Sequence, residues 1–198
     1  MIRMYDILKR NENFANSNKE QITKSAKSQN PVCAVVSCSD SRVPPELLFE
    51  AKLGELFTIR TAGGIIDNAG LASLEYAIEY LNVKTVLVLG HTNCGAVTHA
   101  QEELIHKHQP PSHEKSHLDD VISEIYKNIE GNKQNLTDLN HAIIDNLKAQ
   151  VNKINEDPVI SRSNAEILLY LYNIETGKVS QVKKDIEFNV RKKKLRNL

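Results

Sequence analysis

Two short runs of small and β-branched residues constrain this chain more than any other feature. The runs are VCAVVSC, residues 32–38, and VKTVLVLG, residues 83–90. Runs with this composition are typical of strands that are buried on both faces, as they are in parallel sheets. Each run ends in a polar turn that leads toward a helical pattern. The sequence therefore predicts strand, turn and helix in repeated order, and hence a mainly parallel sheet.

Further apolar patterns complete an α/β fold class, in which a mainly parallel sheet is flanked by helices on both faces and preceded by an N-terminal helical arm. LFTIR, residues 56–60, is predicted to be another strand. ILLYLYNI (167–174) and KVSQV (178–182) are predicted to form a final strand and hairpin. Apolar residues at helical intervals predict the arm from Met4 to Phe14, a helix from Pro45 to Lys52, and helices near 71–81, from Ala96, and over 118–129 and 136–154.

Length and composition favour one domain that acts on a small molecule. A chain of 198 residues that is 40% hydrophobic has room for one sizeable core. We expect a helical arm over 1–30, a catalytic α/β core over 31–190 and a basic tail over 191–198. Because 25 basic residues balance 25 acidic ones, we expect neither a nucleic-acid nor a membrane partner. The opening residues contain no apolar run of signal-peptide length, and three cysteines make a poor disulfide framework, so we expect a cytoplasmic protein.

Side chains that bind metals stand at the ends of the two buried runs. Cys38 ends the first, and His91 and Cys94 follow the second. Because ligands bind where the carboxyl ends of parallel strands open, two thiolates and an imidazole are expected to meet there. Three such ligands suit zinc and leave the fourth position for water, as in catalytic sites. Asp40 could fill that position itself, whereas a bidentate pair with Arg42 could hold the carboxylate away from the metal.

The wording and spacing of several segments closely resemble the β-class carbonic anhydrase family. These segments are CSDSRVPPE (38–46), GELFTIRTAG (54–63) and LEYAIEYLNVKTVLVLGHTNCGAV (74–97), with a weaker echo in LYNIETGKV (171–179). The resemblance implies one zinc ion per subunit, bound by Cys38, His91 and Cys94. It also implies that Asp40 and Arg42 form the carboxylate–guanidinium pair beside the metal.

The same resemblance implies reversible hydration of carbon dioxide to bicarbonate and a proton. The chemical step would be attack by zinc-bound hydroxide that Asp40 and Arg42 orient. In the family the substrate pocket lies at a dimer interface, so the resemblance implies a homodimer or an assembly of dimers, with the N-terminal arm as a clasp. The substrate-binding positions that it implies are Gln29, Phe57, Ala62 and Tyr76.

Other functions stay open on the residues alone. Relatives of the same fold hydrolyse carbonyl sulfide or carbon disulfide with the same metal set. A covalent mechanism would use Cys94 or Cys38 as the nucleophile beside His91. A non-catalytic zinc scaffold would have Asp40 permanently bound to the metal. Cys33, within an apolar run, is expected to be a buried thiol without a function, and the histidines between 99 and 117 are expected to lie in a solvated loop.

Overall fold

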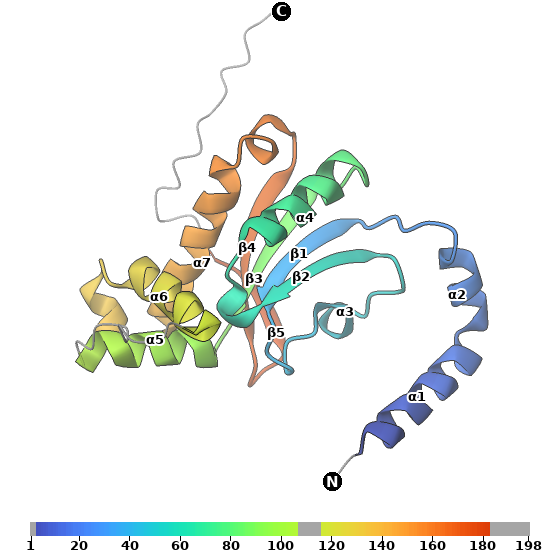
Figure 1. Ribbon diagram of the computed structural model, residues 1–198, viewed down its shortest axis with the longest axis horizontal. Coiled ribbons are helices and arrows are strands. Elements are labelled where there is room, and N and C mark those ends of the chain that lie inside the picture. Colours follow the sequence, from blue (N-terminus) through green and yellow to red (C-terminus); the bar gives the residue numbers. More distant parts are fainter. Residues whose placement is uncertain (1–2, 107–115, 183–198) are drawn as a thin grey trace, which may run out of the picture.

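The computed structural model describes residues 3–106 and 116–182 of the chain. Within these residues five strands form one sheet in the order β2-β1-β3-β4-β5 (Figure 1). Neighbours among β1 to β4 are parallel, and β5 is antiparallel to β4. The predicted α/β class with a mainly parallel sheet is therefore confirmed. The strands are β1 Cys33–Cys38, β2 Leu56–Thr61, β3 Thr85–His91, β4 Glu166–Asn173 and β5 Lys178–Gln181.

The two apolar runs form β1 and β3, which lie side by side in the interior of the sheet. Ala34 pairs with Val86, and the register continues to Ser37 opposite Leu89. Successive side chains of each strand point to opposite faces of the sheet, and side chains on both faces are buried. This explains why the two runs contain so few polar side chains. This register brings the carboxyl ends of β1 and β3 to the same edge of the sheet.

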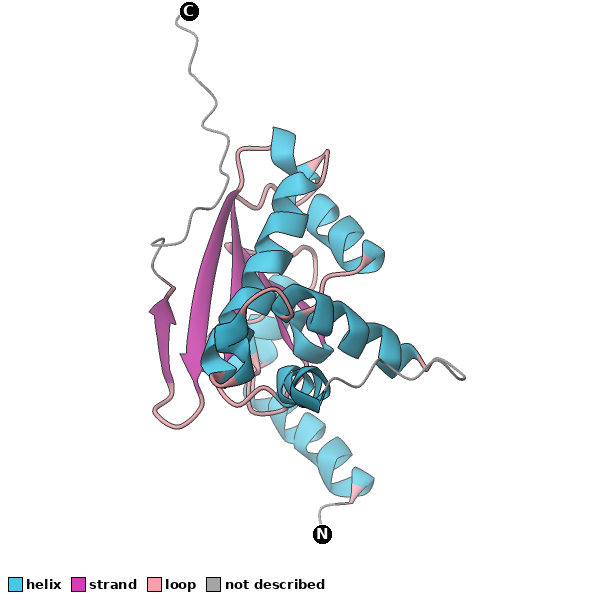
Figure 2. Cartoon of the chain, turned by 90° about the vertical axis from the view of Figure 1, so that its left-hand side faces the viewer, coloured by secondary structure: helices cyan, strands magenta, loops and turns pink. Residues whose placement is uncertain are grey.

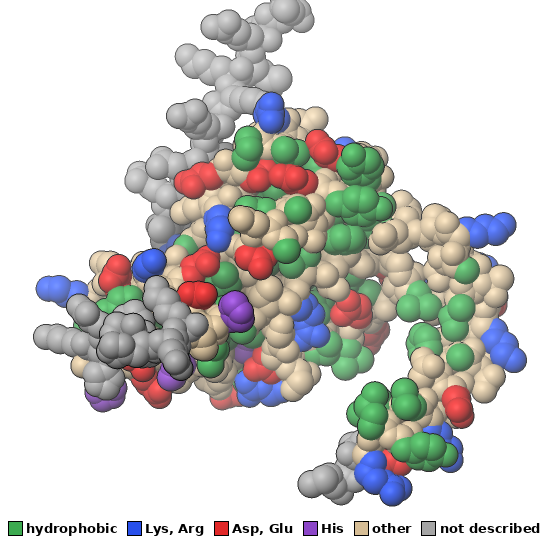
Figure 3. Space-filling view, viewed as in Figure 1, with side chains coloured by type: hydrophobic (Ala, Val, Ile, Leu, Met, Phe, Trp, Pro, Cys, Tyr) green, Lys and Arg blue, Asp and Glu red, His purple; other side chains and the backbone are tan. Residues whose placement is uncertain are grey.

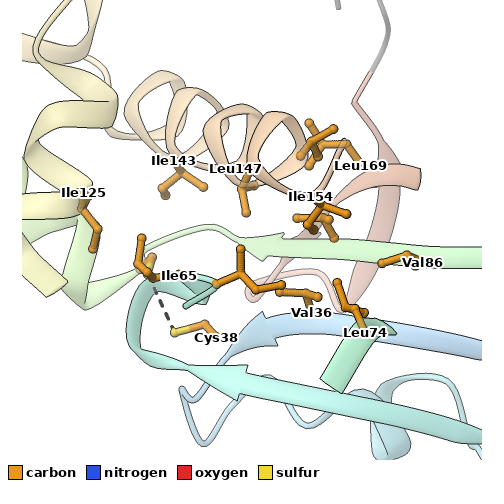
Figure 4. Close-up of a cluster of buried hydrophobic side chains, with 14 of the residues drawn as sticks. Val36, Cys38, Ile65, Leu74, Val86, Ile125, Ile143, Leu147, Ile154 and Leu169 are labelled. Carbon is orange, nitrogen blue, oxygen red and sulfur yellow. Dashed lines mark hydrogen bonds between the residues drawn. The ribbon is translucent and has the colours of Figure 1, made fainter. Parts of the chain in front are cut away.

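Helices cover the two faces of the sheet unequally. The main layer lies on one face (Figure 2), and its core contains buried residues of the helices together with Val36 and Val86. Figure 4 shows Ile143 and Leu147 within this core, close to the edge where Cys38 lies. The opposite face carries a smaller cluster, to which the short helix α3, Pro45–Leu48, contributes Leu48. The main layer consists of α4 Asn68–Glu79, α5 Gly95–His106, α6 His117–Ile129 and α7 Leu139–Glu156.

Two predicted helices have different bounds in the structure. The helix predicted from Pro45 to Lys52 ends at Leu48, because Glu50 adopts a left-handed backbone with φ +48°. Leu136 belongs to a 3-10 turn rather than to α7, because the Asp138 carboxylate accepts from the His141 N–H and so caps α7 at its first turn. The histidines between 99 and 117 were expected in a loop, but His99 and His106 lie on α5 and His117 is the first residue of α6. Residues 107–115, the basic tail and the core beyond residue 182 lie outside the described residues.

The N-terminal arm consists of α1, Met4–Ser17, and α2, Lys19–Ser25, and it projects away from the sheet (Figure 1). Neither helix buries a residue, and hydrophobic side chains lie exposed along the arm (Figure 3). Among the described residues no helix combines the length and the apolar character that crossing a membrane requires. The exposed apolar residues of α1 are Met4, Tyr5, Ile7, Leu8 and Phe14.

The close contact of α7 with β3 gives a stability prediction. A Cβ atom at Gly90 would clash with Leu147 Cδ1, so we expect Gly90→Ala to lower the free energy of unfolding by about 1–3 kcal/mol. Urea denaturation measures the loss. Gly131→Ala is the matched control, because nothing lies within 4 Å of the added methyl group. The Gly90→Ala/Leu147→Ala double variant should lose less stability than the sum of the losses in the two single variants, because the smaller side chain at 147 removes the clash. A loss in the double variant equal to that sum would show that the clash is not the cause.

Candidate metal centre

Three buried ligand atoms meet at the edge of the sheet where β1 and β3 end. Cys38 is the last residue of β1, His91 is the last of β3, and Cys94 lies immediately before α5. One ligand atom from each lies within 4.8 Å of the others, and the two sulfur atoms are 4.0 Å apart. The structure thus brings together the three side chains that the sequence placed at strand ends. All three side chains are at most 7% exposed.

The imidazole of His91 is oriented for a metal. Its Nδ1 lies 2.9 Å from the Thr92 carbonyl oxygen, which only a protonated Nδ1 can satisfy as a donor. Nε2 is then an acceptor, and within the described chain it is buried with no hydrogen-bond partner. Leaving a buried acceptor unpaired costs free energy, and a bound cation removes that cost. Thr92 is itself fixed, because its N–H donates to the Tyr172 carbonyl and its hydroxyl oxygen accepts from the Ile174 N–H.

The two cysteines also suit a cation. The Cys94 sulfur beside it and the His91 side chain lower the pKa of Cys38, whereas the neighbouring Cys38 sulfur and burial raise the pKa of Cys94. One thiolate therefore forms readily, but a second at 4.0 Å is opposed by like charge. A divalent cation would neutralise both, and two thiolates with one imidazole form a donor set that zinc accepts. The residues fit the metal.

Asp40 lies beside this set and is held by Arg42. Its Oδ1 accepts from Arg42 Nε and from the Arg42 backbone N–H, both at 2.9 Å, and its Oδ2 accepts from Nη2 at 2.6 Å. The hydrogen bonds from the guanidinium hold the pKa of Asp40 well below its usual range. Oδ2 is 4.0 Å from His91 Nε2, and Arg42 also donates to the Asn93 carbonyl in the turn between the other two ligands. The carboxylate is thus ionised and directed by a bidentate pair.

Arg60 is a residue at this site that the sequence analysis did not single out. Its guanidinium donates to the carbonyl oxygens of Cys38, at 3.2 Å, and Asp40, at 2.8 Å. It therefore fixes the backbone on both sides of Ser39. Arg60 pairs with Ser37 in the β1–β2 register. The signal that could have identified Arg60 as a site residue is its place at the end of the predicted LFTIR strand, because Cys38 stands at the end of the first apolar run in the same way.

The predicted substrate positions are only partly brought together. The rings of Phe57 and Tyr76 lie 6.3 Å apart, and Tyr76 stacks on Tyr80 at 5.3 Å. Gln29 and Ala62 are exposed at the surface. A cavity of about 10 Å³, large enough for a single water-sized object, adjoins the three ligand atoms. None of Gln29, Phe57, Ala62 and Tyr76 lines it. Tyr76 is 47% exposed, so this chain alone does not enclose that residue.

The chain matches a known family over most of its length. The carbonic anhydrase family model matches residues 33–179, a segment that contains β1 to β4, the start of β5 and all three ligand residues. This chain belongs to the β-class carbonic anhydrase family. Membership agrees with the resemblance carried by the segments around Cys38 and His91.

Curated carbonic anhydrases and solved β-carbonic anhydrase structures resemble the chain. Carbonic anhydrase from Saccharomyces cerevisiae is 33% identical, with 90% of this chain and 88% of that protein covered. Carbonic anhydrase 2 from Mycobacterium tuberculosis is 49% identical, but over only 38% of this chain and 36% of that protein. The chain thus spans about a third of the first mycobacterial relatives. The β-carbonic anhydrase of Coccomyxa, solved in complex with acetazolamide, shares the fold with a TM-score of 0.78 at 24% identity, covering 92% and 87% of the two chains.

The hydrogen bonds between Arg42 and Asp40 predict a measurable shift. In Arg42→Gln the Asp40 carboxylate loses its cation, so its pKa should rise toward the ordinary value of about 3.9. The carboxyl carbon signal of Asp40, followed by NMR from pH 6 down to 2.5, measures the change. The stability that the pair contributes is present above the ordinary pKa and is lost as pH falls through the lowered one.

Arg162→Gln serves as the control, because the Arg162 side chain bonds only to the Pro158 carbonyl among the contacts described and lies outside the metal centre. It should leave the Asp40 titration unchanged. An Asp40 pKa that is the same in the wild type and in Arg42→Gln would contradict the assigned pairing.

Proposed function

We propose that this protein catalyses the reversible hydration of carbon dioxide to bicarbonate and a proton at a zinc ion held by Cys38, His91 and Cys94. The observation that carries the proposal is the set of three buried ligand atoms within 4.8 Å, in which His91 Nε2 has no other partner among the described residues. Three protein ligands match a catalytic zinc site, because a structural site uses four. Family membership supports the same reaction.

The residues around the metal would have different roles in the reaction. When bound, zinc acts as a Lewis acid that lowers the pKa of a coordinated water toward about 7. Asp40, kept ionised by Arg42, is an acceptor only, and it can accept a hydrogen bond from the nucleophile and direct a lone pair toward the carbon of the substrate. Arg42 and Arg60 fix the carboxylate and the backbone that carries it.

The geometry argues against two of the alternatives. A covalent mechanism needs an accessible thiolate, but Cys38 and Cys94 are both buried, and the adjacent Cys38 sulfur also raises the pKa of Cys94. A closed scaffold needs Asp40 on the metal, but both oxygens of Asp40 are bound by Arg42. Hydrolysis of carbonyl sulfide or carbon disulfide uses the same donor set, and it is the second candidate.

We also propose that the functional unit is a homodimer or an assembly of dimers, in which a second copy covers the arm and the outer side of Tyr76. A surface with five exposed apolar side chains on one helix is typical of an interaction site. Two β-carbonic anhydrases of Sordaria macrospora, which share the fold with a TM-score of 0.75 at 22% identity and coverage of 90% and 95%, are described as tetrameric. In this proposal residues 1–30 are the clasp, 31–190 the catalytic core and 191–198 a basic tail, and the free thiols suit a reducing cytoplasm.

Replacement of Asp40 tests the mechanism. Asp40→Asn keeps the size of the side chain but presents an N–H where the carboxylate accepts, so carbon dioxide hydration should fall by about 100-fold or more. Zinc content should stay at one ion per subunit. Stopped-flow hydration across pH, with metal analysis of the same samples, measures both quantities.

Two further variants serve as the negative and the positive control for this experiment. Asp120→Asn, on the exposed side of α6, should leave turnover unchanged, and Cys94→Ser should lose both zinc and activity. Near-normal turnover in Asp40→Asn would refute the role of Asp40. Zinc-replete wild type that is inactive with carbon dioxide at every pH would redirect the assignment to carbonyl sulfide, carbon disulfide or a scaffold.

Charges on the arm test the assembly. Ile7→Glu/Leu8→Glu introduces two carboxylates into the exposed apolar surface of α1, and it should shift the protein toward the monomer in sedimentation velocity. Activity per chain should fall in parallel, because the substrate pocket would be incomplete. Lys9→Glu, an exposed charge reversal on the same helix, is the control. An unchanged sedimentation coefficient in the double variant would exclude the arm from the interface.

A further inference from the structure

Two buried amides on α7 bind the loop that follows β2. Asn146 Nδ2 donates to the Gly63 carbonyl over 3.0 Å, and Gln150 Oε1 accepts from the Ile66 N–H over 2.9 Å. Both side chains are at most 1% exposed. They stand four residues apart, on the same face of the helix. The helix therefore fixes the loop at two points.

This loop touches the metal centre through Gly63. Gly63 lines the small cavity beside Cys38, His91 and Cys94, and the Cys38 sulfur accepts from the Asp40 N–H over 3.4 Å. The neighbouring Gly64 lies against the Cys38 backbone, because a Cβ atom there would be 3.7 Å from the Cys38 nitrogen. Gly63 and Gly64 both adopt a left-handed backbone, with φ of 68° and 69°. Because two successive glycines have wide conformational freedom, their own φ/ψ preferences do not hold the loop in place beside Cys38. The orientation must be imposed from outside the loop.

Asn146 supplies that constraint, and its own orientation is fixed. Its Oδ1 accepts from Asn128 Nδ2 on α6 over 2.9 Å, so its Nδ2 is the end that faces Gly63. Asn146 also lines the small cavity beside Cys38, His91 and Cys94. Two helices of the main layer thus converge on one peptide unit next to the first ligand.

We infer that Asn146 is a positioning residue of the metal centre, which holds the Gly63–Gly64 loop in place beside Cys38. The inference rests on the proposed zinc site. Residues outside the ligand set that hold the ligands and their surroundings in place contribute to metal affinity, and their loss weakens that affinity without removing a ligand. Nothing in the amphipathic pattern of α7 requires an asparagine here, since Ile143 and Leu147 already supply its apolar contacts.

The experiment compares Asn146→Leu, which keeps the volume but removes both hydrogen bonds, with the wild type. Zinc affinity is measured by competition with a chromophoric chelator, and the cobalt-substituted protein reports the thiolate-to-metal charge-transfer band. We expect zinc affinity to fall by about 10- to 100-fold and the band to shift, with three ligands still bound. Asn128→Ala should cause a smaller loss, because it frees the Asn146 amide to turn. It also serves as the second variant if Asn146→Leu does not fold.

Asn135→Ala is the matched control for general destabilisation. Asn135 is fully buried and bonds to the Ile129 carbonyl and to Asp145, but it makes no described contact with residues 62–66. It should lower stability while changing zinc affinity by less than about twofold. Equal affinity in the wild type and Asn146→Leu, or an equal loss in Asn135→Ala, would overturn the inference. Wild type that binds no zinc, or zinc binding that survives Cys94→Ser, would instead overturn the proposed metal site itself.

Discussion

The parallel pairing of β1 with β3 is the interaction on which the rest of this structure depends. It aligns two apolar strands so that Cys38 and His91 end at the same edge, and the turn after β3 then returns Cys94 to within 4.0 Å of Cys38. The burial of β1 and β3 also forbids a one-residue slip, because a slip would exchange the residues facing the two sides of the sheet. The register of β1 against β3 therefore also determines the relative positions of the three ligand residues.

Two arginines, Arg42 and Arg60, fix the backbone of the metal centre beyond the ends of the strands. The segment after Cys38 leaves the sheet beyond Ser39, whose N–H still donates to the Thr61 carbonyl at the end of β2. Arg60 binds its carbonyl oxygens, and Arg42 binds the Asp40 carboxylate and the turn that contains Asn93. Asn93 adopts a left-handed backbone with φ +56°, which asparagine tolerates better than most residues. The Arg42 guanidinium thus joins the turns that follow β1 and β3, and Arg60 fixes the first of these turns.

The sequence predicted the strands, the three ligands and the Asp40–Arg42 pair because each depends on local features. Apolar runs identify the strands, and the ligands stand at their ends. Other features depend on contacts between distant segments. The periodicity of α7 places Asn146 on a buried face, but it cannot say that the partner is the Gly63 carbonyl. The hydrophobic pattern likewise does not predict that most helices cover one face of the sheet. Residues such as Val35 and Leu89 are apolar and buried whichever element covers them.

The site divides into an inner part that one chain completes and an outer part that it does not. The ligand atoms are buried by this chain's own strands and helices, and α7 supports them through the loop at Gly63. Tyr76 and Tyr80 stack against each other yet remain exposed, as does the apolar surface of α1. A hydrophobic wall for a small apolar substrate can exclude water only if something covers it. Metal binding and substrate binding should therefore have different requirements: the first depends on the fold of one chain, and the second on assembly.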